Sequence, residues 1–153
     1  MADEHKGKNG GAKRAPDSQA PPIQAQVMAQ YVKDLSFENP NVTKLLGGPG
    51  GDPNMSLEVS VNAQRMPKPD LFESAIELRA HATSKEGTIY IFECVYAGLF
   101  KLQNIPEPAL EPFLLINCPT LIFPFLRRLA ADVTREGGFP PLLLDPIDFA
   151  GLF

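Results

Sequence analysis

The side chains best suited to catalysis or metal binding are two histidines and two cysteines, and none stands in a pattern that a known reaction requires. His81 falls on the polar side of a predicted strand beside Arg79, with no nucleophile next to it, and His5 lies in a polar N-terminal stretch. Cys94 and Cys118 form no Cys-x-x-Cys pair and no Cys/His cluster with metal-ligand spacing. We therefore expect ordinary buried thiols, no metal, no cofactor and no enzymatic activity.

The acidic residues mostly alternate with apolar ones along predicted strands, as on a solvated face. Three stand apart: Asp34 and Glu38 share one face of the first strand, and Glu93 lies among Ile91 and Val95 on an otherwise apolar face. A mixed acidic and apolar patch suits docking of a basic partner, and paired surface charge is an equally weighted alternative. A small enzyme with Glu93 as its acid, or a small-ligand-binding oligomer, is the second hypothesis.

Bulk properties narrow the class of protein further. The 153 residues carry a net charge of −4, with 14 basic and 18 acidic residues, which argues against a nucleic-acid binder. No N-terminal signal sequence is evident, and no apolar run approaches the roughly 18 residues of a membrane span. We expect a cytoplasmic protein without membrane insertion, organised as a disordered tail over residues 1–22 and one domain over residues 23–153.

Period-two alternation predicts four strands before the helices begin. In the first strand it places one set of residues on a single face, interrupted by Lys33: Val27, Ala29, Tyr31, Leu35 and Phe37. The later strands alternate more cleanly, around residues 55–63, 72–81 and 88–96. Ser84-Lys85-Glu86-Gly87 predicts a hairpin turn between the last two.

Beyond the strands the apolar spacing becomes helical. Pro106, Pro108 and Pro112 predict an irregular or broken entry, and a helix follows Pro119, with a kink at Pro124. Asp145 or Asp148 is expected to cap a short last helix. The predicted fold class is α+β, a four-stranded antiparallel sheet with a long helix and a short C-terminal helix packed on it.

The apolar side chains exceed what one small core needs, which favours an oligomer with an apolar groove left for ligands. One helical stripe is expected to bury between subunits: Leu121, Phe125, Leu129 and Val133. Client grooves are expected along a second set, for which ordinary core packing is the alternative: Leu57, Val59, Val61, Leu144, Phe149, Leu152 and Phe153. A purely structural oligomer is a third hypothesis.

Three stretches together resemble the SecB export-chaperone family: residues 31–41 (YVKDLSFENPN), 118–127 (CPTLIFPFLR) and 138–153 (GFPPLLLDPIDFAGLF). The resemblance implies a homotetramer, a dimer of dimers, that binds non-native precursor proteins, keeps them translocation-competent and delivers them to the SecA ATPase without hydrolysing ATP. It also implies a SecA-binding set: Asp34, Glu38, Ile91 and Glu93. Family members usually continue beyond this C-terminus, so part of a groove wall and of the SecA contact is expected to be missing.

Overall fold

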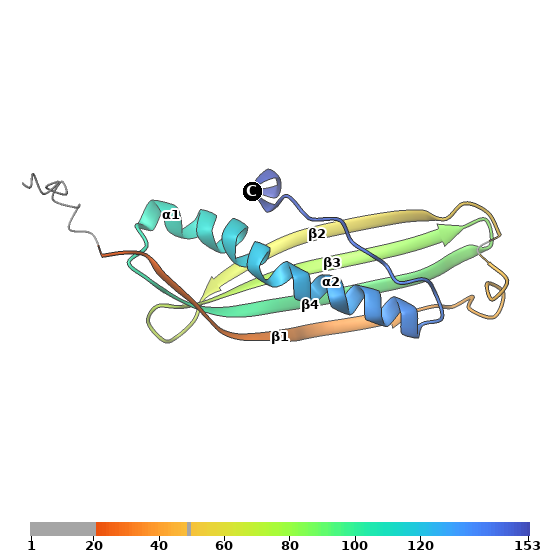
Figure 1. Ribbon diagram of the computed structural model, residues 1–153, viewed down its shortest axis with the longest axis horizontal. Coiled ribbons are helices and arrows are strands. Elements are labelled where there is room, and N and C mark those ends of the chain that lie inside the picture. The colour runs from red at the N-terminus through yellow and green to blue at the C-terminus, as the bar shows by residue number, and fades with distance from the viewer. Residues whose placement is uncertain (1–20, 49) are drawn as a thin grey trace, which may run out of the picture.

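The computed structural model describes residues 21–48 and 50–153, so nearly all of the predicted tail lies outside the described residues. Four long strands form one antiparallel sheet in the order β1-β4-β3-β2, and the helices cross one of its faces (Figure 1). The strands are β1 (Gln24–Glu38), β2 (Asn54–Arg65), β3 (Leu71–Ser84) and β4 (Gly87–Gln103). This confirms the predicted α+β class, and within residues 21–48 and 50–153 all the helices lie on one side of the sheet.

Strands β2, β3 and β4 present the faces that alternation predicted. On β4, the side chains of Phe92, Cys94 and Phe100 are almost fully buried toward the helices. Their cross-strand partners on β3 carry the same pattern, because residues paired across an antiparallel ladder share a face. The predicted hairpin is also present, since β3 ends at Ser84 and β4 begins at Gly87, which has a φ of 108°.

The prediction for the middle of β1 was wrong. The pairing of β1 with β4 shifts at Met28 and again at Lys33, so β1 holds one extra residue at each of these two places. Between these two bulges the alternation is inverted, and Ala29 and Tyr31 lie on the face away from the helices while Val32 lies on the helix side. The two bulges restore the original phase, so both ends of the strand keep their predicted faces.

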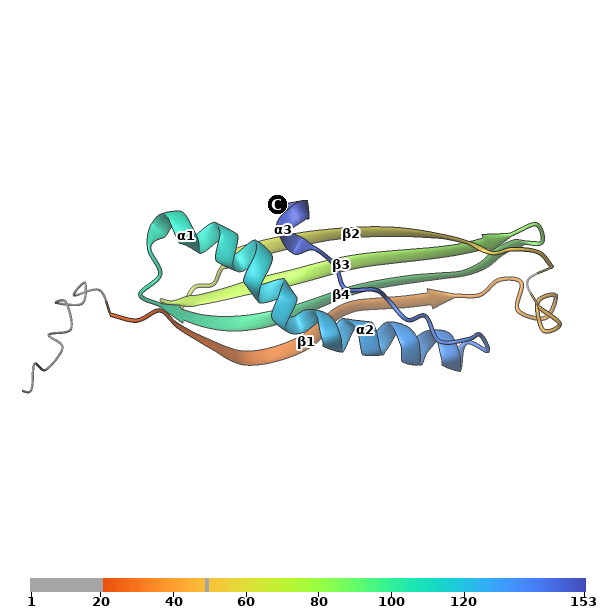
Figure 2. The ribbon, with the colours of Figure 1, turned by 45° about the horizontal axis from the view of Figure 1, so that its top comes forward.

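The entry to the long helix is irregular, as one of the two predicted alternatives has it, and it is not broken, because residues 107–117 are helical. Helix α1 (Glu107–Pro112) leads through a π turn, η1 (Phe113–Asn117), into α2 (Cys118–Glu136). Pro108 stands in the first turn, where no backbone N–H is needed. Figure 2 shows the bent axis of this helical segment, in which Pro119 and Pro124 each remove a backbone donor.

One buried hydrogen bond ties the π turn to the sheet. In a π turn the carbonyl of Leu114 would accept from position 119, where Pro119 has no N–H to give. The hydroxyl of Ser74 on β3, fully buried, donates to that carbonyl instead, at 2.8 Å. Strand β3 therefore holds the helix at the point where the backbone ladder is interrupted.

Helix α2 packs closely on β4 because Gly98 has no side chain. A β-carbon there would lie 3.0 Å from Ile122 Cγ2 of α2 and 2.7 Å from the ring of Phe100.

By length and composition the segment Glu107–Glu136 is apolar enough to cross a membrane, contrary to our expectation from the sequence. Core helices meet the same criterion, so this is weak evidence for a span.

The chain then returns along the helix as an extended segment. Thr134, fully buried in α2, donates to the carbonyl of Ala130 at 2.7 Å and accepts from the N–H of Leu142 at 2.8 Å. The segment ends in the short helix α3 (Phe149–Leu152), where Asp148 caps the first turn by accepting from the Gly151 N–H. Of the two caps predicted from the sequence, Asp145 and Asp148, the structure has Asp148.

Candidate binding surfaces

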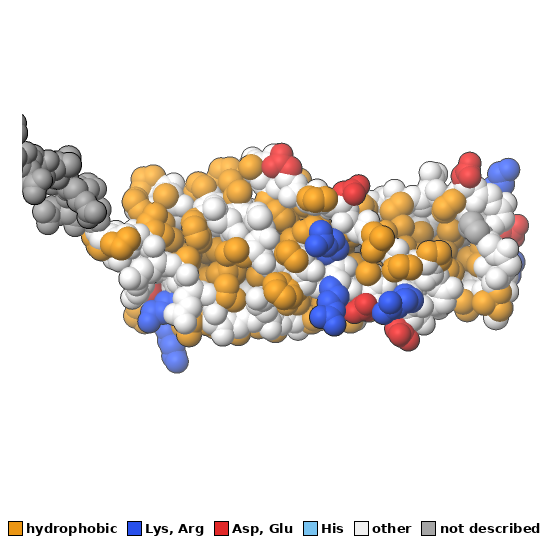
Figure 3. Space-filling model, in the orientation of Figure 1, with side chains coloured by type: hydrophobic (Ala, Val, Ile, Leu, Met, Phe, Trp, Pro, Cys, Tyr) orange, Lys and Arg blue, Asp and Glu red, His pale blue; other side chains and the backbone are white. Residues whose placement is uncertain are grey.

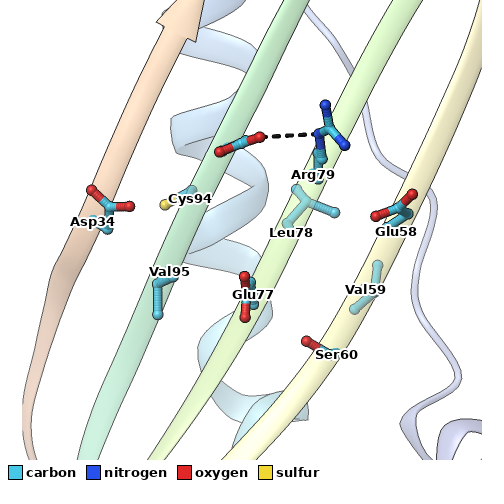
Figure 4. Close-up of a pocket in the computed structure, with 10 residues that line it drawn as sticks. Asp34, Glu58, Val59, Ser60, Glu77, Leu78, Arg79, Cys94 and Val95 are labelled. Carbon is cyan, nitrogen blue, oxygen red and sulfur yellow. Dashed lines mark ion pairs between the residues drawn. The ribbon is translucent and has the colours of Figure 1, made fainter.

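The face of the sheet away from the helices gathers acidic side chains from all four strands. A shallow cavity of about 240 Å3 lies there, and its lining includes Asp34 from β1, Glu58 from β2, Glu77 from β3 and Glu93 from β4. Figure 4 shows Asp34, Glu58 and Glu77 on their neighbouring strands. Among the described residues, Arg79 is the one basic member of that lining. The local charge is therefore negative, which attracts a basic surface.

The four predicted docking residues lie on this same face. In the β1–β4 register Glu38 is opposite Ile91, Ser36 is opposite Glu93 and Asp34 is opposite Val95. The acids of β1 and β4 are therefore diagonal neighbours and never stand directly opposite each other, an arrangement that avoids the cost of facing like charges.

The polar pairs on this face offer no catalytic arrangement. The Arg79 Nε atom lies 3.0 Å from Glu93 Oε1, and both side chains are nearly half exposed, so this pair contributes little to stability. His81 Nε2 lies 3.4 Å from Thr88 Oγ1. Among the described residues, no group of three or more His, Cys, Asp or Glu side chains is placed to hold a metal ion.

One acid on this face is buried. Glu73 of β3 is 6% exposed and accepts hydrogen bonds from the Tyr31 hydroxyl, from Lys33 Nζ at 2.7 Å and from Gln64 Nε2 at 3.2 Å. Burial opposes its charge, but the bonds from Lys33 and Tyr31 lower the pKa of Glu73 below 4.5. Burial and the neighbouring carboxylate raise the pKa of Tyr31 to about 12.

An apolar groove lies on the opposite side of the sheet, between β2 and the C-terminal helix. It has a volume of about 240 Å3 and is lined by Val59 and Val61 of β2 together with Phe149, Leu152 and Phe153. Leu152 and Phe153 are 54% and 60% exposed, whereas Phe149 is buried and forms the floor. Five of the seven predicted client residues therefore come together in one groove.

The groove continues toward α1 in a second hollow of about 450 Å3. The two hollows share Val61 and Leu115, and the second adds Leu110 and Leu114 from the helical entry. The sequence prediction missed these leucines because the prolines around them were taken to break the helix. Leu110 and Leu114 are four residues apart, which is a helical spacing, and this was the signal available in the sequence.

Two predicted client residues lie elsewhere. Leu144 is 6% exposed and belongs to the core, so its side chain is not offered to a ligand. Leu57 is 49% exposed on β2 but does not line either hollow. The groove is thus built from the second half of β2 and the C-terminal helix, with the helical entry as its second wall.

The helix-bearing face keeps a wide apolar surface in the single chain. Figure 3 shows hydrophobic side chains along this face, separated by a few charged ones. On α2, Leu121 and Phe125 are 51% and 48% exposed, while Leu129 and Val133 are half-buried against the core. The predicted stripe is therefore split between an exposed half and a half that packs inside the subunit.

The two cysteines are free and buried, in agreement with their reading as core thiols. Burial raises the pKa of Cys94 to about 11 and that of Cys118 to about 12. Because the thiolate is the reactive form, both side chains behave as small apolar residues near neutral pH.

Comparison with known proteins decides between the classes left open by the geometry. A family model described as "Preprotein translocase subunit SecB" matches residues 17–153. The chain belongs to the SecB family. The match begins before residue 23, where we place the start of the domain, and reaches Phe153 through every described strand and helix.

Relatives of SecB type match at high identity. The "Protein-export protein SecB" of Parvibaculum lavamentivorans is 50% identical over 145 residues, which are 95% of this chain and 83% of the relative. The protein of the same name from Maricaulis maris is 52% identical over 136 residues, 89% of this chain and 77% of the relative. Membership of this family makes the chain a protein-export chaperone.

The fold has a solved counterpart. A SecB-like chaperone from Mycobacterium tuberculosis, solved with a peptide from an antitoxin, superposes with a TM-score of 0.66 at 16% identity. The alignment covers 80% of this chain and 90% of that one. At this identity the likeness concerns the fold, and it supports the SecB-like arrangement of sheet and helices.

Proposed function

We propose that this SecB-family chain holds non-native precursor proteins in the cytoplasm, without a catalytic step, and delivers them to the SecA ATPase. One observation carries the proposal: an exposed apolar groove and an acidic surface lie on opposite faces of the same sheet. A client and a basic partner bound at these places do not compete for the same residues. Both are then held by one subunit at the same time.

The groove suits an extended, apolar segment of a client. Its two hollows run on from one another between β2 and the helical segment, and its rim carries exposed Leu152 and Phe153. A peptide there gains mainly from burial of apolar surface, at about 25 cal/mol per Å2, and pays for its own ordering. The affinity of one groove should therefore be modest, with avidity supplied by several grooves on one oligomer.

Assembly supplies those additional grooves. Leu121 and Phe125 of α2 form an exposed apolar face on the helix side of the sheet, and Val32 and Leu35 of β1, each 42% exposed, lie on that side too. A second copy of the chain, in the homotetramer that the resemblance implies, covers this face with apolar surface of its own. The acidic face stays outside, where SecA reaches it.

The acidic face suits SecA through charge. The cavity lining holds four carboxylates and one guanidinium, and Glu38 and Ile91 extend the same surface. Attraction between surface charges falls off within a Debye length, so binding of SecA should weaken as salt rises. Ile91, half-buried near the start of β4 and opposite Glu38, adds an apolar contact.

The groove is tested by measuring how well the protein prevents aggregation of an unfolded client without nucleotide. Replacing both Leu152 and Phe153 by Ser removes the exposed rim, and we expect at least about a fivefold loss in client affinity, because each apolar side chain is worth ~1 kcal/mol or more when buried. Leu143→Ser is the matched control, since Leu143 is 75% exposed and lines neither hollow. Equal protection by the double variant and the control refutes this placement of the client.

A further inference from the structure

The buried carboxylate of Glu73 on β3 links β1 and β2 through side-chain hydrogen bonds on the acidic face of the sheet. Its partners Tyr31 and Lys33 stand on β1, two strands away across β4, and Gln64 stands on neighbouring β2. The positions of β4 and β3 level with Tyr31 are Ala97 and Ala75. Their short side chains leave the space over which the long side chains of β1 reach Glu73.

The partners of Glu73 belong to the part of β1 whose alternation is inverted. Lys33 is the extra residue of the second bulge, and Tyr31 lies between the bulges. Simple alternation would turn both toward the helices, together with Val27 and Leu35. The inversion instead places Val32 and Gln30 on the helix side, where Gln30 Oε1 accepts a hydrogen bond from the Tyr96 hydroxyl at 3.1 Å.

The two bulges can only be lost together. Loss of one alone would flip one end of β1 and expel either Val27 or the core-packed Phe37 from the helix side. Loss of both returns the strand to simple alternation and keeps both ends on their faces, with one end of β1 shifted by two residues along β4. We look for an interaction that favours the inverted arrangement, and Glu73 bonds to Tyr31 and Lys33, the two long polar side chains of this part of β1 that lie on the outer face.

We propose that Glu73 is a positioning residue that fixes the register of β1 between its two bulges and so keeps Lys33 off the helix-bearing face. The importance of keeping Lys33 off the helix-bearing face rests on the proposed assembly through that face. An ammonium group among Val27, Leu35 and the exposed side chains of α2 would be costly to cover with a second subunit. Glu73 offers the same group an ion pair on the opposite face.

The register of β1 against β4 can be tested directly with an engineered disulfide between the two strands. Ala29 is paired with Leu99 on the acidic face, so the double substitution Ala29→Cys, Leu99→Cys should give a β1–β4 disulfide readily under a fixed oxidant. After simple alternation returns, position 29 points to the other face and the bond does not form. In a Glu73→Leu background we expect this β1–β4 disulfide to form at least about tenfold more slowly.

Two controls separate register from general loosening. A second engineered pair, Ser60→Cys of β2 with Glu77→Cys of β3, joins paired positions on the same face and should react at an unchanged rate. Glu86→Leu removes an exposed acid from the β3–β4 turn and should leave both disulfides unchanged. If the β1–β4 disulfide forms at the same rate with native Glu73 and in the Glu73→Leu background, the proposal is overturned, and equal slowing of both disulfides overturns it too.

A milder variant covers the case in which Glu73→Leu does not fold. Glu73→Gln keeps the size and a hydrogen-bond acceptor but loses the charge, so it should slow the β1–β4 disulfide by a smaller factor, and an unchanged rate there counts against the proposal. For the assembly half, light scattering should show a tetramer dissociating at about tenfold higher concentration in Glu73→Leu, and an unchanged tetramer contradicts it. If Phe125→Asp leaves the tetramer intact, the proposed assembly fails while the disulfide rates still decide the register.

Discussion

Replacement of Ser74 by Ala tests how the sheet holds the long helix over the groove. The serine is fully buried and its hydroxyl donates to the carbonyl of Leu114, which Pro119 leaves without a backbone donor. Alanine leaves that buried carbonyl unpaired, and such an acceptor costs ~1–3 kcal/mol. This is a large share of the roughly 5–15 kcal/mol that holds a typical domain together. We expect urea unfolding at fixed protein concentration to show a loss of this size.

A second variant tests whether the backbone N–H that is absent at Pro119 explains the cost of Ser74→Ala. Pro119→Ala restores an N–H at the position that a π turn pairs with Leu114. In that background Ser74→Ala should cost at least ~1 kcal/mol less than in the native sequence, a coupling measured by the double-mutant cycle. A Ser74→Ala cost below ~0.5 kcal/mol, or the same cost in both backgrounds, would refute the reasoning.

Two further predictions follow from the exposed helix face and the buried acid. Phe125→Asp places a charge at a position that is 48% exposed, and light scattering should show dimers or monomers instead of the proposed tetramer. A tetramer that persists in this variant excludes this face as the interface. Because the folded-state pKa of Glu73 is lowered from 4.5, its ionised form stabilises the fold above that pH, and the contribution disappears as pH falls through the lower folded value. The difference in unfolding free energy between the native chain and Glu73→Gln should therefore be full at pH 7 and shrink below about pH 4.5, and a difference independent of pH contradicts this role for the charge.

Much of the sheet was predictable because its signals are local. Strands β2, β3 and β4 alternate over most of their length, with one register shift at Ala82/Thr83, and one face of the sheet packs on the helices, so their register leaves little freedom. The same alternation placed Asp34 and Glu38 on one face of β1 and Glu93 on one face of β4. The acids of β1 and of β4 lie on the same face of the sheet because the two strands are neighbours. From the sequence, only the family resemblance indicated that these acids meet.

The errors arose where a distant residue or a missing donor decides the local structure. The inverted part of β1 depends on Glu73, about 40 positions away in the chain, and no pattern within β1 signals it. The prolines predicted an irregular or broken helical entry, and the structure has the irregular one, with a π turn after Pro112. Pro108 occupies a first turn, and the carbonyl freed at Leu114 is satisfied by Ser74 from another strand. Leu144 was placed in the client groove because exposure cannot be read from hydrophobicity alone.

The most direct test of the proposed export function is calorimetric titration of SecA into the protein loaded with an unfolded client. The account predicts binding to the loaded complex that weakens as salt rises, because the acidic face stays free when the groove is filled. Reversing both Asp34 and Glu93 to Lys should reduce SecA affinity at least about tenfold while the client stays bound and the tetramer persists. Unchanged affinity of the reversed protein, or loss of SecA binding on filling the groove, would contradict the account.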